Sequence, residues 1–307
     1  MSDPATIAAA GTQVPDAGEI FLDHAGWFVS DMDRAAAAFE RLGFELTPYS
    51  VHGDRDPETG EHRLVGSANR LAMLELGYLE ILTPIAGTDT PVSRHMRASL
   101  AEHEGVHLAA FTVADAESEA GLLADRGFSV MPTVHLHRTV ETAGGGTGEV
   151  AFTVIRADLG SVPEGRLQTL THHTPALMWQ PRHGAGDNGF RAFSGLVWAS
   201  RDPAASAARL ARYTNRHARE MAGGWEIALE RGRLFILDRA DAETRYGPGL
   251  PGADPAVVAV LFQGSVAQAC DRLAAAGVAV RRESAAHLIV PPAEAVGVAL
   301  VLHDQAA

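Results

Sequence analysis

The chain has little cysteine and no excess of basic residues. Its 307 residues include a single cysteine, Cys270, which excludes an intramolecular disulfide and any metal site built from several thiolates. Lys and Arg number 25 against 38 Asp and Glu, so the net charge of -13 repels a phosphate backbone. We therefore expect no nucleic-acid partner, and a lone thiol is consistent with a reducing compartment.

Long hydrophobic runs are also lacking. No stretch approaches the roughly 18 uninterrupted apolar residues of a membrane span, and the N-terminus has neither a basic segment nor an apolar one after it. These absences predict a cytoplasmic protein with no membrane partner. Residues 1–18 are small and polar without periodicity, which is typical of a flexible tail.

The composition is that of a folded protein with two cores. Hydrophobic residues make up 46% of the chain and charged residues 21%, within the globular range. A chain of 307 residues is long enough for two domains of ordinary size.

A repeated order of elements gives the architecture. Residues 21–29 read as an apolar strand, and a helix with apolar residues at helical spacing follows, capped by Ser30 or Asp31 and ended by Gly43. Three more strands are expected, one that begins at Phe44 and two at 69–76 and 78–84.

The same order recurs from about residue 105 to 170. The expected elements there are a strand at 106–113, a helix at 114–128, and strands at 128–134, 149–157 and 165–170. Weaker third and fourth copies begin at FSGLVWAS and AVVAVLF, after a connection rich in Pro, Gly and His over residues 171–189. Four βαβββ modules and an α+β fold class follow from this repetition.

These modules resemble a known superfamily. The segments LDHAGWFVSDMDRAAAAFERLGF and YLEIL resemble the opening strand, helix and closing strand of the vicinal oxygen chelate superfamily, which includes glyoxalases, bleomycin-resistance proteins and extradiol dioxygenases. Within it, the chain most resembles two-domain glyoxalase-like proteins. The resemblance implies two cup-shaped mixed β-sheet domains with helices outside, an N-terminal one at 19–180 and a C-terminal one at 181–307.

The same resemblance implies a metal site. The superfamily takes ligands from the first and last strands of each module, and aligning YLEILTP on RLQTLTH places Gln168 at the position of Glu80. The expected ligands are His24, Glu80, His107 and Gln168. This set suits one divalent ion, Fe, Mn, Zn, Ni or Co, with positions left open for substrate.

Each of these residues also has an ordinary explanation. A single histidine is more often a surface or core residue than a ligand, and a neutral amide such as that of Gln168 is a weak ligand. His172 is the alternative to Gln168, or a residue that orients the substrate. Asp23 is expected to point to the opposite face, as a surface residue or as support for His24.

The third and fourth modules lack comparable ligands. Their positions equivalent to His24 fall near Ser194 and Val258, and their closing strands carry no carboxylate in place of Glu80. The C-terminal domain is therefore expected to be a degenerate copy. Extradiol dioxygenases of four modules usually hold iron in their C-terminal half, so this chain departs from them.

The expected function is that of a metal-dependent lyase or isomerase. A small vicinally oxygenated substrate would react through a metal-stabilised enolate, with Glu80 and His172 as the catalytic residues and Glu80 doubling as general base. The alternatives are an Fe(II) extradiol-type dioxygenase and a non-catalytic small-molecule binding or resistance protein. No organic cofactor is implied, because the chain has no dinucleotide fingerprint or P-loop. The expected assembly is a monomer or a homodimer.

Overall fold

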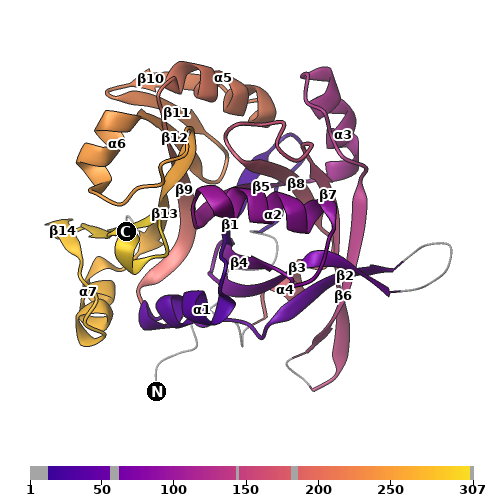
Figure 1. Cartoon of the computed structure of the whole chain (residues 1–307), viewed down its shortest axis with the longest axis horizontal. Coiled ribbons are helices and arrows are strands. Elements are labelled where there is room, and N and C mark those ends of the chain that lie inside the picture. Colours follow the sequence, from indigo (N-terminus) through magenta and orange to yellow (C-terminus); the bar gives the residue numbers. More distant parts are fainter. Residues whose placement is uncertain (1–12, 56–61, 143–144, 181–185, 305–307) are drawn as a thin grey trace.

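The strands form two eight-stranded mixed sheets, which we call the first and second sheets (Figure 1). The computed structural model describes residues 13–55, 62–142, 145–180 and 186–304. The first sheet has the order β2-β3-β4-β1-β5-β8-β7-β6 and the second the order β10-β11-β12-β9-β13-β16-β15-β14, so the two repeat one topology.

The strands of the first sheet are β1 Ile20–Phe28, β2 Ser50–Arg55, β3 His62–Met73, β4 Tyr78–Pro84, β5 Gly105–Val113, β6 Val134–Glu141, β7 Thr147–Arg156 and β8 Arg166–His172. Those of the second are β9 Phe190–Ser200, β10 Ala218–Met221, β11 Gly224–Ala228, β12 Arg233–Asp238, β13 Ala256–Gly264, β14 Arg281–Ser284, β15 His287–Val290 and β16 Ala299–Asp304. In each sheet the opening strands of two modules pair antiparallel at the centre, and each pairs parallel with the closing strand of its own module.

The predicted α+β class and the repeated modules are confirmed. One strand lies later than expected, because β6 begins at Val134 rather than Phe128. In the expected segment, Val130 makes only an isolated bridge to Ala157. Pro132 lacks the N–H that a continuous ladder there would need.

Four helices follow the opening strands of the modules: α1 Met32–Arg41, α3 Ala116–Asp125, α5 Pro203–Thr214 and α7 Val266–Ala275. The cap of α1 is Asp31, whose side chain accepts from the backbone N–H of Arg34. Apolar residues of all four helices belong to one core cluster, together with Trp27 of β1 and Trp198 of β9. This cluster lies on what we call the outer face of each sheet.

Two helices that the sequence did not predict lie on the opposite, inner faces of the sheets, one helix on each sheet. They are α2 Pro91–Glu102 and α6 Arg239–Tyr246. Met96 of α2 packs with Phe28, Leu82 and Leu108 in a separate cluster of the first sheet. Tyr246 of α6 packs in the corresponding cluster of the second sheet. A short helix, α4 Pro175–Met178, and a 3-10 turn, η3 Pro292–Glu294, complete the described elements.

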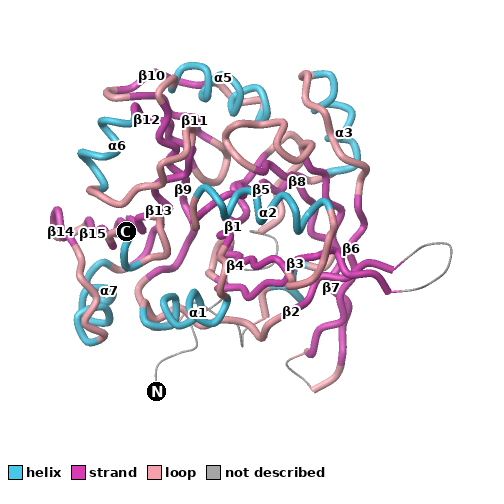
Figure 2. The backbone as a smooth tube through the Cα atoms, in the orientation of Figure 1, coloured by secondary structure: helices cyan, strands magenta, loops and turns pink. Residues whose placement is uncertain are grey.

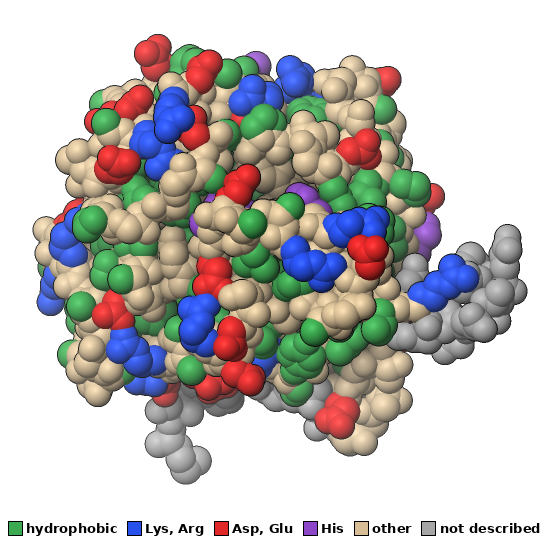
Figure 3. Space-filling view, viewed as in Figure 1, with side chains coloured by type: hydrophobic (Ala, Val, Ile, Leu, Met, Phe, Trp, Pro, Cys, Tyr) green, Lys and Arg blue, Asp and Glu red, His purple; other side chains and the backbone are tan. Residues whose placement is uncertain are grey.

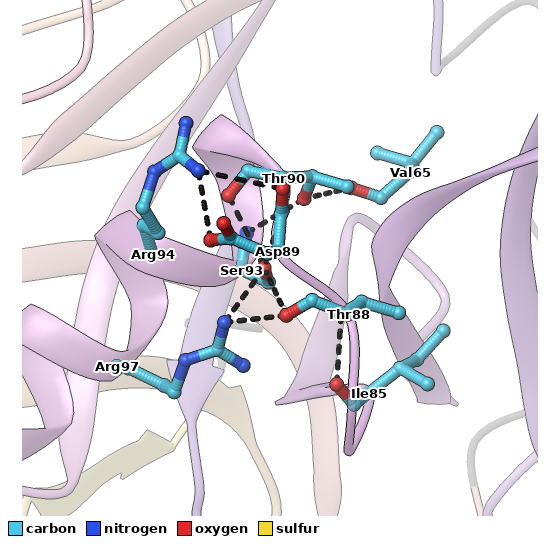
Figure 4. A network of polar contacts seen from close by, with 8 residues as sticks. All are labelled: Val65, Ile85, Thr88, Asp89, Thr90, Ser93, Arg94 and Arg97. Carbon is cyan, nitrogen blue, oxygen red and sulfur yellow. Dashed lines mark hydrogen bonds and ion pairs between the residues drawn. The ribbon is translucent and has the colours of Figure 1, made fainter.

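The start of α2 is fixed by a network of polar contacts (Figure 4). Thr90 and Ser93 form a capping box, and the Thr90 hydroxyl also donates to the carbonyl of Val65 at 2.7 Å. A Cβ at Gly66 would lie 2.2 Å from that hydroxyl, so only glycine permits this approach. The network holds α2 against β3 and thereby over the inner face.

The two sheets share their outer-face core. Phe44, in the loop after α1, packs on Phe190 of the second sheet with ring centroids 5.2 Å apart. Backbone hydrogen bonds also join the sheets, from Leu22 to Arg231 at 2.8 Å and from Phe193 to Leu76 at 2.9 Å. Figure 2 shows β1 and β9 side by side at the centre of the molecule.

The expected tail lies mostly outside the described residues, which begin at Gln13. Gln13 is buried, and its amide contacts the backbone of Glu75 and Gly77. Among the described residues, every helix is too short or too polar to cross a bilayer.

Candidate functional site

Three of the predicted ligands meet on the inner face of the first sheet. The Nε2 atom of His24 lies 3.5 Å from Oε2 of Glu80 and 3.1 Å from the amide nitrogen of Gln168. Strand register explains the meeting, because Glu80 pairs with Gly26 in β1 and Gln168 pairs with Ala110 in β5. The three side chains come from β1, β4 and β8, so central strands position all of them.

Asp23 and His172 lie directly behind His24. Asp23 accepts from Nδ1 of His24 at 2.6 Å with one oxygen and contacts Nε2 of His172 at 2.9 Å with the other. Burial alone would raise the pKa of Asp23, but the charges and hydrogen bonds of His172 and His24 hold it well below its usual range. The ionised carboxylate therefore fixes the Nδ1–H tautomer of His24 and leaves its Nε2 lone pair free to bind.

The placement of Asp23 differs from the expected surface position. Leu22 pairs with Phe111 and His24 pairs with Ala110, so Asp23 is an extra residue, a β-bulge, between them. The bulge interrupts the alternation of β1, and the Asp23 side chain is fully buried. Of the two expectations for this residue, support for His24 is the one that the geometry matches.

His172 is buried away from any open surface. Its side chain is fully buried and its ring packs on Trp179, with centroids 4.8 Å apart, and on Phe152. The ring reaches the site only through Asp23. The contacts therefore favour a positioning role for His172 over direct contact with a substrate.

Glu80 is held in its ionised form. Its Oε1 accepts from the Asn69 amide at 2.7 Å, which leaves Oε2 facing His24. Burial alone would raise the pKa of Glu80, but His24, His52, Asn69 and Arg138 together lower it below the ordinary value. The side chain is 12% exposed, so it keeps a narrow opening to solvent.

Asn69, His52 and Arg138 were not predicted as site residues. Asn69 shares a face of β3 with Leu71 and Met73, so a period of two could have indicated it. Nδ1 of His52 is hydrogen-bonded to the Ser67 hydroxyl at 2.9 Å. Burial and the charge of Arg138 lower the pKa of His52 to about 4. Strand β6, which carries Arg138, begins later than predicted, and for that reason its inner-face residues were not assigned.

His107 does not join His24 and Glu80. Trp27 pairs with Val106 and Gly26 with Leu108, so His107 is the bulged residue of β5. It is the counterpart of Asp23 in the repeat, and Leu108 is the counterpart of His24. The His107 ring instead stacks on Phe28 at 5.1 Å, and its Nε2 lies 3.0 Å from the carbonyl of His103.

The second sheet repeats this geometry without donors. Ser194 and Val258 are the bulged residues there, so each expected equivalent is displaced by one. By register, the counterparts of His24, Leu108, Glu80 and Gln168 are Gly195, Ala259, Phe235 and Val301. None of these side chains can bind a metal.

The donor set that meets in the first sheet fits a divalent ion. Atoms bonded to one ion at about 2.1 Å and at right angles lie about 3 Å apart, close to the 3.5 Å between His24 Nε2 and Glu80 Oε2. The Gln168 amide faces His24 with its nitrogen at 3.1 Å, and it would bind an ion through its oxygen instead. The set consists of one imidazole, one carboxylate and one amide. Within the described ranges, no group of three His, Cys, Asp or Glu side chains is arranged to hold a metal, so Gln168 is needed as the third donor.

The paired eight-stranded sheets and the polar site on central strands define a member of the vicinal oxygen chelate superfamily. A family profile described as a glyoxalase-like domain matches residues 22–214, more than half of the chain. The chain therefore belongs to the glyoxalase-like domain family. A comparison with curated proteins finds no match.

Solved structures share the fold at low identity. A hypothetical protein from Staphylococcus aureus is 10% identical, with a TM-score of 0.65 over 93% of this chain and 100% of the other. A mutant 4-hydroxymandelate synthase from Streptomyces coelicolor is 15% identical, with a TM-score of 0.52 over 94% of each chain. A fusion of a xylose isomerase-like TIM barrel with 4-hydroxyphenylpyruvate dioxygenase is 12% identical, with a TM-score of 0.57 over 95% of this chain and 50% of the other. At these identities the likeness concerns the fold alone.

Proposed function

We propose that the chain is a metal-dependent vicinal oxygen chelate enzyme, a lyase or isomerase acting on a small vicinally oxygenated substrate. The observation that carries the proposal is the meeting of His24 Nε2, Glu80 Oε2 and the Gln168 amide at one point of the first sheet. These side chains would hold the ion. When bound, it would supply Lewis-acid stabilisation of negative charge on neighbouring substrate oxygens.

The chain's own residues supply orientation and the proton acceptor. Asp23, backed by His172, keeps the binding nitrogen of His24 directed at the site. Asn69 anchors Oε1 of Glu80, so Oε2, the oxygen that would bind the ion, would leave it to take a proton from a substrate carbon. Since its lowered pKa makes Glu80 a weak base, the substrate carbon must be acidified by a neighbouring oxygen-bearing group.

The donor set favours a lyase or isomerase over a dioxygenase. Fe(II) oxygenases use two imidazoles and one carboxylate, whereas His24 supplies the one imidazole that contacts Glu80 among the described residues. Two of the proteins with similar folds are named as a dioxygenase fusion and a synthase, so the dioxygenase alternative has an assay of its own. Oxygen consumption with a panel of catechols would support the dioxygenase instead.

The test begins with metal content. Protein purified without chelators should carry about one divalent ion per chain by elemental analysis, and His24→Ala should lose it. A metal content equal in the two proteins would contradict the assignment of His24.

Glu80→Gln then tests the proton acceptor. The assay follows, by NMR, the exchange of carbon-bound hydrogen with deuterium from D2O in a panel of small hydroxy ketones and keto acids. The exchange rate should be at least about 100-fold lower with Glu80→Gln than with the wild type, while thermal unfolding stays unchanged. Exchange at the wild-type rate in a folded Glu80→Gln protein would remove Glu80 from the reaction.

A further inference from the structure

A second polar cavity lies apart from the proposed metal site. It has a volume of about 220 Å3 and lies between the C-terminal end of α2, the start of β5 and the segments 160–166 and 253–257. Its walls include neither His24, Glu80 nor Gln168. Figure 3 shows histidine side chains reaching the surface beside α2.

Three imidazoles and a guanidinium line this cavity, and all of them except His107 have buried hydrogen-bonding atoms without a partner in the described part of the chain. They are His95, His103, His107 and Arg166. Nε2 of His95, both ring nitrogens of His103 and Nε of Arg166 are buried without a hydrogen-bond partner in the described part of the chain. Buried polar atoms are normally satisfied, so this many together indicate a ligand that the cavity is built to receive.

The charge of the cavity favours an anion. The Arg166 guanidinium is a full positive charge, and Arg239 lies close enough to His103 to lower its pKa. Glu164 is neutralised by Arg209, which binds its carboxylate through two nitrogens at 2.7 and 3.0 Å. Glu102, an exposed residue at the rim, is the one carboxylate on these walls that opposes an anion.

The end of α2 also opposes an anion, but weakly. The last carbonyls of a helix are equivalent to roughly half a negative charge. Arg166 carries a full charge within the cavity, so its attraction outweighs the helix end.

The walls of the cavity are fixed before any ligand arrives. The Glu164 carbonyl accepts from the Trp198 indole at 2.9 Å, which ties the segment before β8 to the second sheet. A Cβ at Gly165 would lie 2.8 Å from the carbonyl oxygen of His107, so glycine lets this segment approach β5. On the opposite side, Arg239 donates to the carbonyls of Pro251 and Ala253.

We propose that this cavity is a binding site for a small oxyanion, a carboxylate or a phosphate, held by Arg166 and by the imidazoles of His95 and His103. A guanidinium presents two N–H groups to such an anion, and the orphaned imidazole nitrogens complete the shell. The site uses none of the residues proposed to hold the metal, although Arg166 lies close enough to Glu80 for their two charges to interact.

The experiment titrates the whole protein with inorganic phosphate and, separately, with acetate, by calorimetry at low ionic strength. Wild-type protein should bind one equivalent of at least one anion in the millimolar range or tighter. Arg166→Met, which removes the charge and keeps the volume, should weaken binding about 10-fold or more. Glu102→Gln should tighten binding, because it removes the opposing charge.

Arg94→Met is the matched control, since Arg94 lies on the same helix but pairs with the exposed Asp89 far from the cavity lining. It should bind like the wild type. The ratio of the phosphate and acetate affinities identifies the preferred anion. Failure of both anions to bind, or equal binding by Arg166→Met and wild type, would overturn the proposal. Glu80→Gln should bind at least as tightly as the wild type, because it removes a negative charge that interacts with Arg166, so the two proposals can fail separately.

Discussion

At the scale of single residues, one extra residue in each opening strand decides which side chains meet. The bulges at Asp23 and His107 put two successive side chains on nearby positions, where strict alternation would put them on opposite faces. His24 follows its bulge and reaches the site. Leu108 follows the second bulge, so an apolar side chain occupies the fourth ligand position.

A substitution at Leu108 tests this assignment. Leu108→His should add a second imidazole to the site and raise the affinity for a divalent ion about 10-fold or more, measured by competition with a chelator. His107→Ala should leave the metal content unchanged, because its ring contacts Phe28 and His103. Loss of metal in His107→Ala, or no gain in a folded Leu108→His protein, would contradict the register.

The sequence was sufficient to predict that His24, Glu80 and Gln168 lie together, because the closing strands of the two repeats place Glu80 and Gln168 at matching points beside the opening strands. Their role as metal ligands stays a prediction. The sequence was not sufficient for His107, since a bulge shifts a side chain without changing the hydrophobic pattern around it. The same shift of one residue applies to Ser194 and Val258 in the second sheet.

At the scale of elements, the sequence did not predict the two inner-face helices, and α2 is the one that lies beside the site. Its capping box, Thr90 and Ser93 with Pro91 between them, was a readable signal. The helix matters to the cavity beside it, because it covers the inner face, carries His95 and ends at its cap, His103. Both imidazoles line the polar cavity between α2 and β5.

These two histidines predict a loss of stability in acid. Burial, then Arg166 and His107, lower the pKa of His95 from 6.5 to about 4, and burial, then His107 and Arg239, lower that of His103 to about 4. Between pH 4 and pH 6.5 the unfolded chain therefore binds more protons at these histidines than the folded chain does. Folding stability falls as the pH drops from 6.5 toward 4. We expect a loss of about 1 kcal/mol for each histidine, since partial exposure screens the effect.

Urea unfolding across that pH range, in buffers without phosphate or carboxylate, measures the effect. The double variant His95→Gln, His103→Gln should lose less stability than the wild type as the pH falls, while carboxylate protonation affects both proteins alike. Parallel pH profiles for the two proteins would rule out a contribution from these imidazoles.

At the scale of the whole molecule, the two sheets are joined through one core. The boundary between domains that we predict near residue 180 lies in the segment between β8 and β9, and the packing does not stop there. Aromatic side chains of the first sheet's loops and of the second sheet belong to one cluster. Sequence repetition predicts two sheets, but it contains no information on which faces of those sheets pack together.

A substitution in the second sheet should therefore loosen the first. Phe262 is fully buried, and its ring packs on Phe190 at 5.0 Å and on Phe44 at 6.3 Å. Phe262→Ala should cost about 3 to 5 kcal/mol of unfolding free energy. It should also speed hydrogen exchange in β1 and β5 as well as in β9 and β13, because the shared core opens as a unit.

Phe235→Ala is the control for this prediction. Phe235 is in the second sheet but packs on the inner-face cluster with α6, which does not reach the first sheet. Its removal should speed exchange around β12 and leave β1 and β5 near the wild-type rate. If Phe262→Ala also left β1 and β5 protected, the two halves would unfold independently, and the sheets would be separate domains in the thermodynamic sense.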